Sequence, residues 1–503
     1  TSIATDPEGD FWHWEVFFAG NDAKSVSVPT PAPLGSGPSS MRVWFQGFTS
    51  TPAPVDHRAR VEIGGTPIGT VSWDGSNPPQ GTFAVPAPLL AEGSTSVTIV
   101  PEKPAGVDFA IFYLDRIEFD YFRRSELVSG HLHGNHPSAG WRAVGGLVPA
   151  AIALDASATN IPRRLGVSGA GVEVPAGVDR LVVADLGAAA APQSIEADTA
   201  SDLRSSSNRA DYLIVAGAGL EPAAQALATL RGGGLETMVV SIADVYDEFA
   251  HGAVDALAVQ RLLSWAHQNW SLAPSYVVIF RDGSFDYRDR FGVGEKLVLA
   301  PMTASAGGLV PADQRLADVD GDGLIDIAIG RIPVRFSDQG FDYVANLQAR
   351  DQTPGTWSTT ALWVADNPDF GGEFPAARIA VAAAAPATWT DLEVDRSRLD
   401  TAPARAALID ALGDGAAYVT FLGHGGIDRI ADEGLLTTAD VASIGNGPER
   451  PVFAAMTCSV GRSDLPGAES LTEELLLGGN GGSLAGNSPA AKQPNADRVA
   501  IST

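Results

Sequence analysis

The hydrophobic pattern of the chain changes near residue 210. Before that point, short runs alternate apolar and polar residues, with turns rich in Pro, Gly and Ser between them. After it, continuous apolar runs alternate with segments whose apolar residues recur every three or four positions. The first pattern predicts half-buried strands, and the second predicts buried parallel strands with helices between them.

The alternating pattern of the first region is typical of a β-sandwich. Its clearest runs lie at residues 41–48, 58–65, 94–101 and 109–122. Shorter apolar pieces continue to about residue 205, with few helical signals. We expect residues 1–205 to form a β-rich region, either as one sandwich or as two modules.

The second region predicts strands and helices in alternation. Strands are expected at residues 211–219, 236–249, 276–283, 361–367, 417–426, 451–458 and 481–487, and helices at 221–234 and 254–270. This order indicates a parallel sheet with helices on its faces. We therefore expect an α/β domain built from two halves, residues 206–335 and residues 336–503.

Composition narrows the possible functions. The 503 residues are enough for more than one core. A formal net charge of −27 argues against nucleic-acid binding, which needs clustered Lys and Arg. The single cysteine, Cys458, excludes an internal disulfide. Since no apolar run approaches the roughly 20 residues that span a bilayer, we expect no transmembrane segment in this chain.

Two predicted strands end in reactive side chains. His424 lies near the end of the strand at 417–426, flanked by Gly423, Gly425 and Gly426, and Cys458 ends the strand at 451–458. The carboxyl ends of parallel strands meet at one edge of a sheet, so imidazole and thiol can face each other there. A cysteine attacks as thiolate, which a nearby imidazole generates or holds as an ion pair. The backbone N–H groups of Gly425 and Cys458 could stabilise an oxyanion.

An acidic segment, DVDGDGLID at residues 318–326, resembles the loop of an EF-hand. The predicted ligands are Asp318, Asp320, Asp322, the backbone carbonyl of Leu324, and Asp326. Alternating carboxylates and a sharp turn at Gly323 suit Ca²⁺, which prefers oxygen ligands. Because Ile329 stands in place of the usual bidentate Glu, we expect a structural Ca²⁺ bound with reduced affinity, and we expect no organic cofactor.

The spacing of His424 and Cys458 resembles the signature shared by caspases, legumains, separases and gingipains, in which His-Gly and Cys follow successive strands. The caspase string Gln-Ala-Cys-Arg-Gly is absent. The string MTCSVG at residues 456–461 and its context are similar to the gingipain-like family of cysteine peptidases. Further similar segments are residues 210–252, 274–289 and 318–334, and residues 112–124 resemble the end of the sandwich that precedes the catalytic domain in many relatives.

The resemblance implies a caspase-like fold and a cysteine endopeptidase acting on protein or peptide substrates. Cys458 would be the nucleophile, His424 the general acid and base, and Asp366 the acidic support of the histidine. Glu373, and after it Asp369, would form the acidic floor of a pocket for Arg or Lys before the scissile bond. The resemblance also implies a bacterial protein that is secreted or held at the cell surface.

Two other functions fit the same residues. One is a sortase-like transpeptidase, with the same nucleophile but an amine as acyl acceptor. The other is a catalytically silent surface protein that binds protein or glycan through its sandwich.

Relatives continue through another helix and a strand with a Gly-Asp-Pro motif. Because the sequence ends at Thr503, we expect a catalytic domain that is incomplete at its C-terminus.

Overall fold

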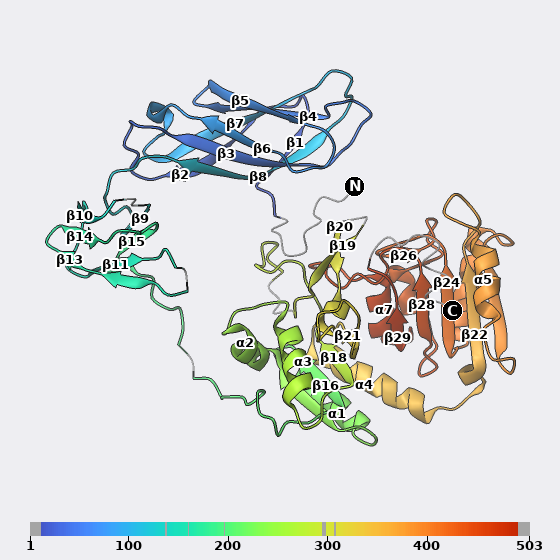
Figure 1. The fold of residues 1–503 in the computed structure, drawn as a ribbon. Coiled ribbons are helices and arrows are strands. Elements are labelled where there is room, and N and C mark those ends of the chain that lie inside the picture. Colours follow the sequence, from blue (N-terminus) through green and yellow to red (C-terminus); the bar gives the residue numbers. More distant parts are fainter. Residues whose placement is uncertain are drawn as a thin grey trace. The chain divides into compact units, whose positions relative to one another are not determined.

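A computed structural model describes residues 12–135, 138–158, 160–195, 197–293, 298–305 and 308–490. The chain divides into two compact units, the first ending at Asp198 and the second beginning at Thr199. Figure 1 shows a first unit built of strands and a second in which helices alternate with strands. Strand-rich sheets followed by parallel sheets with flanking helices confirm the predicted fold class.

The first unit begins with a sandwich of two antiparallel sheets. One sheet has the order β1 (Glu15–Phe18), β8 (Ile111–Asp120), β3 (Ser40–Gly47), β6 (Gln80–Ala84). The other has the order β2 (Lys24–Thr30), β7 (Gly93–Glu102), β4 (His57–Ile63), β5 (Thr66–Trp73), and the short helix η1 (Ala87–Leu89) precedes β7. Every second residue of β3 and β4 is buried in one apolar core, including Phe45 and Val61. The alternation in the sequence is therefore the two-residue period of strands with one buried face.

Smaller sheets form the rest of the first unit. One has the order β12 (Arg163–Leu165), β11 (Ala151–Asp155), β15 (Leu181–Asp185), β9 (His131–Gly134), and the other has the order β10 (Gly140–Ala143), β14 (Gly171–Val174), β13 (Val167–Ser168), with η2 (Leu186–Ala188) after β15. They share an apolar core of their own that includes Leu132, Val172 and Val183.

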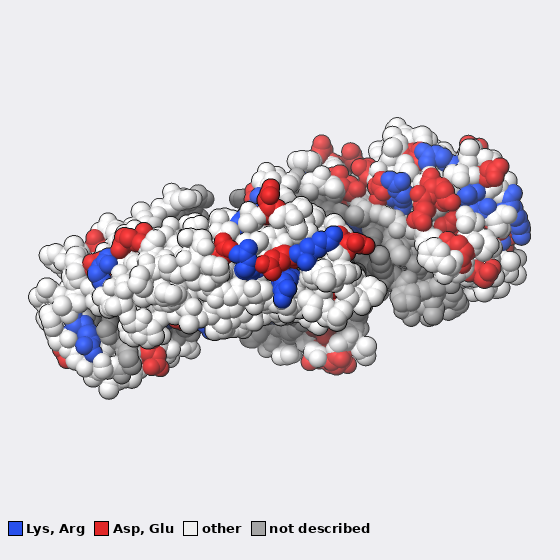
Figure 2. Space-filling view, turned by 90° about the horizontal axis from the view of Figure 1, so that it is seen from above, with Lys and Arg blue, Asp and Glu red and all other residues white. Residues whose placement is uncertain are grey.

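On the face of the protein seen in Figure 2, basic side chains lie beside acidic ones, so this face carries mixed charge and no large basic patch.

The first half of the second unit is a parallel sheet of four strands. Their order is β17 (Thr237–Ser241), β16 (Tyr212–Ala216), β18 (Tyr276–Phe280), β21 (Ala328–Ile332). Helices α2 (Ile242–Ala250) and α3 (Ala258–Asn269) pack on one face, and α1 (Glu221–Arg231) and α4 (Ser337–Gln352) pack on the other. A hairpin of β19 (Met302–Ser305) and β20 (Gly308–Pro311), followed by η3 (Asp313–Leu316), is inserted before β21.

The structure corrects one predicted element in this half. The strand expected over residues 236–249 ends at Ser241, and α2 begins at Ile242. The side chain of Ser241 accepts a hydrogen bond from the backbone N–H of Ala243, which caps the helix. The apolar residues of α2 recur at helical spacing and face the core. Because they follow the apolar residues of the strand directly, the sequence does not show where the two-residue period of the strand ends and the helical period begins.

The second half contains a parallel sheet of five strands. Their order is β23 (Thr390–Asp395), β22 (Thr360–Ala365), β24 (Tyr418–Leu422), β28 (Val452–Met456), β29 (Ala485–Asn487). Helices α6 (Thr401–Gly413) and α7 (Leu471–Leu477) contribute to the core on one face, and α5 (Phe374–Ala382) contributes to the core on the other. The remaining elements are η4 (Thr356–Thr359), η5 (Thr438–Ser443) and a small sheet of β25 (Gly425–Gly426), β26 (Arg429–Ile430) and β27 (Leu436–Thr437). None of the helices in the described part of the chain combines the length and hydrophobicity that a membrane crossing requires.

Candidate active site

His424 and Cys458 lie beyond the carboxyl ends of two neighbouring strands. In the parallel pair of β24 and β28, Leu422 is opposite Met456. His424 follows Leu422 by two positions, and Cys458 follows Met456 by two positions, so both reactive side chains leave the sheet at the same level. Cys458 is half-buried at this edge.

The turns that carry these two residues are in close contact. A Cβ atom on Gly425 would lie 2.4 Å from Oγ1 of Thr457 and 3.2 Å from the carbonyl oxygen of Cys458, so only glycine fits at this position. Ser459, directly after Cys458, has a φ of 56°, which is costly for a residue with a side chain. Such strain is concentrated at functional sites, where the surrounding structure holds it in place. The turns that carry Gly425 and Cys458, the predicted oxyanion donors, therefore lie against each other.

Asp366 lies behind His424 but does not touch its ring. This buried carboxylate follows β22 and accepts hydrogen bonds from the backbone N–H groups of His424, at 3.1 Å, and Asn367, at 2.9 Å. Burial raises the pKa of Asp366, although the two hydrogen bonds oppose this effect. The sequence analysis placed Asp366 as the acid that supports the histidine, and in the structure its contact is with the backbone of the turn.

The acid that contacts the imidazole is Asp369, which the sequence analysis had placed in the substrate pocket. Nε2 of His424 lies 2.9 Å from Oδ2 and 3.2 Å from Oδ1 of Asp369. Partial burial would raise the pKa of Asp369, but hydrogen bonds from the N–H of Gly371 and from His424 outweigh it and hold the pKa below its usual value. A Cβ atom on Gly371 would lie 2.6 Å from Cε1 of His424, so the glycine lets the turn and the ring meet.

Aromatic rings complete the surroundings of His424. Phe374, fully buried at the start of α5, meets the imidazole edge to face, with ring centroids 5.4 Å apart. Phe370 lies at the tip of the turn between Asp369 and Gly372, with its ring centroid 5.7 Å from that of the imidazole. Glu373, the first choice for the acidic floor of the pocket, is exposed at the N-terminus of α5.

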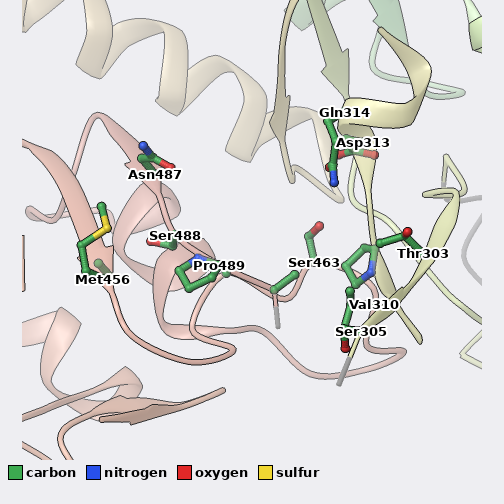
Figure 3. Close-up of a pocket in the computed structure, with 14 residues that line it drawn as sticks. Thr303, Ser305, Val310, Asp313, Gln314, Met456, Ser463, Asn487, Ser488 and Pro489 are labelled. Atoms are coloured by element: carbon green, nitrogen blue, oxygen red, sulfur yellow. The ribbon is translucent and has the colours of Figure 1, made fainter. Parts of the chain in front are cut away.

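A cavity of about 440 Å³ adjoins the end of the strand that carries Cys458. In Figure 3, the second half contributes Met456, Ser463, Asn487, Ser488 and Pro489, and the first half contributes Thr303, Ser305, Val310, Asp313 and Gln314. Most of its polar groups are hydroxyls and amides. Its carboxylate, on Asp313, is already paired with the guanidinium of Arg331 through two hydrogen bonds of 2.7 Å.

The acidic loop brings together three of its four aspartates. One carboxylate oxygen from each of Asp318, Asp320 and Asp326 lies within 4.8 Å of the others, and Asp322 is not part of this group. Asp322 instead accepts a hydrogen bond from the N–H of Leu324. Oxygen donors at this spacing suit Ca²⁺, and the cation would relieve the repulsion between the three carboxylates.

A buried pair of acids lies behind the turn that follows Cys458. Asp282, beyond β18, and Glu473, on α7, share a hydrogen bond between their carboxyl groups, and Nε of Arg335 lies 2.8 Å from Asp282. The N–H of Phe285 also donates to the carbonyl of Asp464, so this contact joins the two halves of the unit. Burial and the adjacent Asp282 carboxylate raise the pKa of Glu473 to about 9.

The raised pKa predicts that alkaline pH weakens the contact between the halves. In the unfolded chain Glu473 would titrate near 4.5, so folding takes up a proton between that value and about 9. This contribution to stability is complete below pH 4.5 and is lost as pH rises through 9. As pH rises from about 6 to about 8, the free energy of unfolding of the natural protein should fall by about 3 kcal/mol relative to that of Glu473→Gln, which stays neutral, measured by urea unfolding.

Glu474→Gln is the matched control for this experiment. Glu474 is the next residue of α7 and is less buried, so its substitution should change the pH dependence less. Identical pH dependence of the Glu473→Gln variant and the natural protein would contradict a protonated Glu473.

The chain is similar to a known peptidase family and to several solved structures. The model of peptidase family C25 matches residues 205–497. Latent PorU from Porphyromonas gingivalis has a similar fold, with a TM-score of 0.55 and 17% identity over 70% of this chain and 38% of that chain. Gingipain R (RgpB) gives a TM-score of 0.45 and 15% identity over 61% of this chain and 68% of its own. No curated protein sequence matches. The chain thus spans 38% of the length of PorU, and the likeness between the two is one of fold.

Proposed function

Because the chain belongs to peptidase family C25, we propose that it is a cysteine endopeptidase with Cys458 as nucleophile and His424 as general acid and base. The observation that carries the proposal is the register of β24 and β28, which places the two residues level at one edge of the sheet. The partial exposure of Cys458 and the strained turn after it support the same assignment.

The proposed reaction proceeds through an acyl-enzyme. The Cys458 thiolate attacks the scissile carbonyl carbon, and the backbone N–H groups of Gly425 and Cys458 stabilise the oxyanion. The C–N bond then breaks, and the imidazolium of His424 gives its proton to the leaving amine. Water attacks the resulting thioester while the imidazole takes its proton, which releases the carboxylic acid and restores the thiol.

Asp369 and Asp366 take different parts in this proposal. Asp369 holds Nε2 of His424, which leaves Nδ1 as the ring nitrogen that exchanges a proton with Cys458. Asp366 fixes the turn through the backbone N–H of His424. One acid therefore orients the ring, and the other positions the residue that carries it.

A preference for Arg or Lys before the scissile bond is the finer part of the proposal, and it depends on Glu373. Asp369 is engaged with His424, and Asp313 in the adjoining cavity is engaged with Arg331. Glu373 is exposed in the loop that carries Asp369, so its carboxylate is available to a basic side chain.

Covalent labelling tests the proposal directly. Acyloxymethyl-ketone probes with Arg, Lys or Asp at P1 should modify Cys458, as read by mass spectrometry of the digested protein, with Arg and Lys faster than Asp. Equal rates for all three would refute the basic preference, and no labelling would favour a silent binding protein. Adding an amine nucleophile separates hydrolysis from transpeptidation, because only a transpeptidase gives a new amide as its main product.

We also propose that the acidic loop binds Ca²⁺ through Asp318, Asp320 and Asp326, and that the protein works outside the cytoplasm. Carboxylate loops of moderate affinity suit the high Ca²⁺ concentrations found there. An acidic surface with only four lysines in the sequence stays hydrated in such conditions.

Removing Ca²⁺ is therefore expected to lower the melting temperature. Ligand at about 100 times its dissociation constant stabilises a fold by about 2.7 kcal/mol, a shift of about 5 °C for a unit of this size. The measurement is a thermal scan of chelator-treated protein with and without added CaCl₂, using MgCl₂ as the control salt. Asp320→Asn should lose the response, and equal melting temperatures in all conditions would contradict the site.

A further inference from the structure

Phe370 is an exposed aromatic residue beside the imidazole of His424. Its side chain is 98% exposed, more than any other large hydrophobic residue in the described part of the chain. It occupies the tip of a tight turn in which Asp369 and Gly372 exchange two backbone hydrogen bonds of 3.2 Å. The centroid of its ring is 5.7 Å from that of His424. The ring therefore offers apolar area, directly beside the imidazole, that a bound ligand could remove from water.

The turn itself does not depend on the phenyl group. The backbone hydrogen bonds close it, the N–H of Gly371 donates to Asp369, and Asp369 binds the imidazole. Buried Phe374, rather than Phe370, anchors the loop in the core. Apart from its approach to the imidazole of His424, the exposed aromatic side chain is therefore available to a ligand.

The side of the scissile bond follows from the chemistry of His424. A general acid must reach the nitrogen of the leaving amine, so the imidazole lies on the leaving-group side of the scissile carbonyl. Phe370 lies next to that imidazole and away from the sheet core. This position would put the phenyl ring near the first residues after the cleaved bond.

We propose that Phe370 is a specificity-determining residue that binds an apolar side chain in the leaving peptide, at one of the two positions after the scissile bond. This inference rests on the proposed peptidase function. Covering both the phenyl ring and an aliphatic substrate side chain removes apolar surface from water, and this gain is absent with a polar residue at that position.

The experiment compares two kinds of substrate for each variant. Internally quenched peptides carry either Leu or Ser at the first two positions after the scissile bond and are otherwise identical. A short aminocoumarin amide with the same acyl part has no residue after the bond. For Phe370→Ala we expect kcat/KM for the Leu peptide to fall about 10- to 30-fold, with changes of about 2-fold or less for the Ser peptide and the amide.

Two further variants make the comparison specific. Phe370→Leu keeps an apolar surface and should retain most of the preference for Leu. Phe341→Ala removes another exposed phenyl ring, on α4, and should leave all rates unchanged. An equal loss on all three substrates would overturn the inference, because Phe370 would then act through the position of His424. No cleavage and no labelling of Cys458 in the natural protein would instead overturn the peptidase function itself.

Discussion

Replacing Cys458 by Ala is expected to abolish peptide cleavage, lowering kcat/KM by at least about 10⁴-fold. The chain has no other cysteine, so no second thiol can replace it. Since Cys458 is half-buried and its removal leaves no large cavity, the melting temperature should change little. Cleavage of a quenched peptide, labelling by the ketone probe and a thermal scan measure the three quantities.

His424→Ala should have a comparable effect, and the chain offers a matched control for it. His251 is also followed by glycine, but it lies at the end of α2 rather than beyond a strand. His251→Ala should therefore keep full activity.

If Cys458→Ala retained more than a small fraction of the natural rate, a nucleophile elsewhere in the protein would have to carry the reaction.

The sequence was sufficient to predict the placement of His424 and Cys458, because that placement depends only on hydrophobic runs and parallel pairing. Both strands are buried on both faces, which makes their apolar runs continuous and easy to recognise. The strand predicted at residues 481–487 from weaker apolar character is present beside β28, but only over Ala485–Asn487.

The acid that contacts the imidazole was not predicted, because the contact depends on the conformation of a loop. Asp366 and Asp369 are three residues apart, and either could reach a histidine from a strand end. The string Asp-Phe-Gly-Gly at residues 369–372 held the available signal, since paired glycines permit a tight turn and close approach to a ring. Composition alone does not decide which acid faces the imidazole.

The buried acids could not be predicted for a different reason. Asp282 and Glu473 lie in different halves and are distant in the sequence, so no local pattern links them. In the sequence, the charged residues 281–290 fit equally a solvated loop and a loop that lines a cleft, and in the structure Arg281, Asp282 and Asp286 are buried. Charged residues are usually exposed, and only tertiary contact shows when they are not.

Asp369→Asn is expected to lower kcat by about 10²- to 10⁴-fold with little change in stability. The carboxylate accepts a hydrogen bond from Nε2–H of His424, and in the proposed mechanism it would stabilise the imidazolium that forms with the Cys458 thiolate. An amide is neutral and can also donate to Nε2, so it neither stabilises the imidazolium nor fixes the tautomer. The rate of Cys458 alkylation by iodoacetamide should also shift toward higher pH, because the thiolate loses its stabilised counter-ion.

Asp366→Asn distinguishes the role of Asp366 from that of Asp369. The amide oxygen can still accept the N–H of His424, so kcat should fall by about 10-fold or less and the pH profile of alkylation should stay in place. Substitution of Asp369, which contacts the ring, should therefore lower kcat more than substitution of Asp366, although Asp366 is the more deeply buried of the two. The opposite result would be a kcat of Asp369→Asn within about 3-fold of the natural value, together with lost activity and a shifted pH profile of alkylation in Asp366→Asn. The ring would then have to turn toward Asp366 during the reaction, and the acidic partner of His424 would be the one first predicted from the sequence.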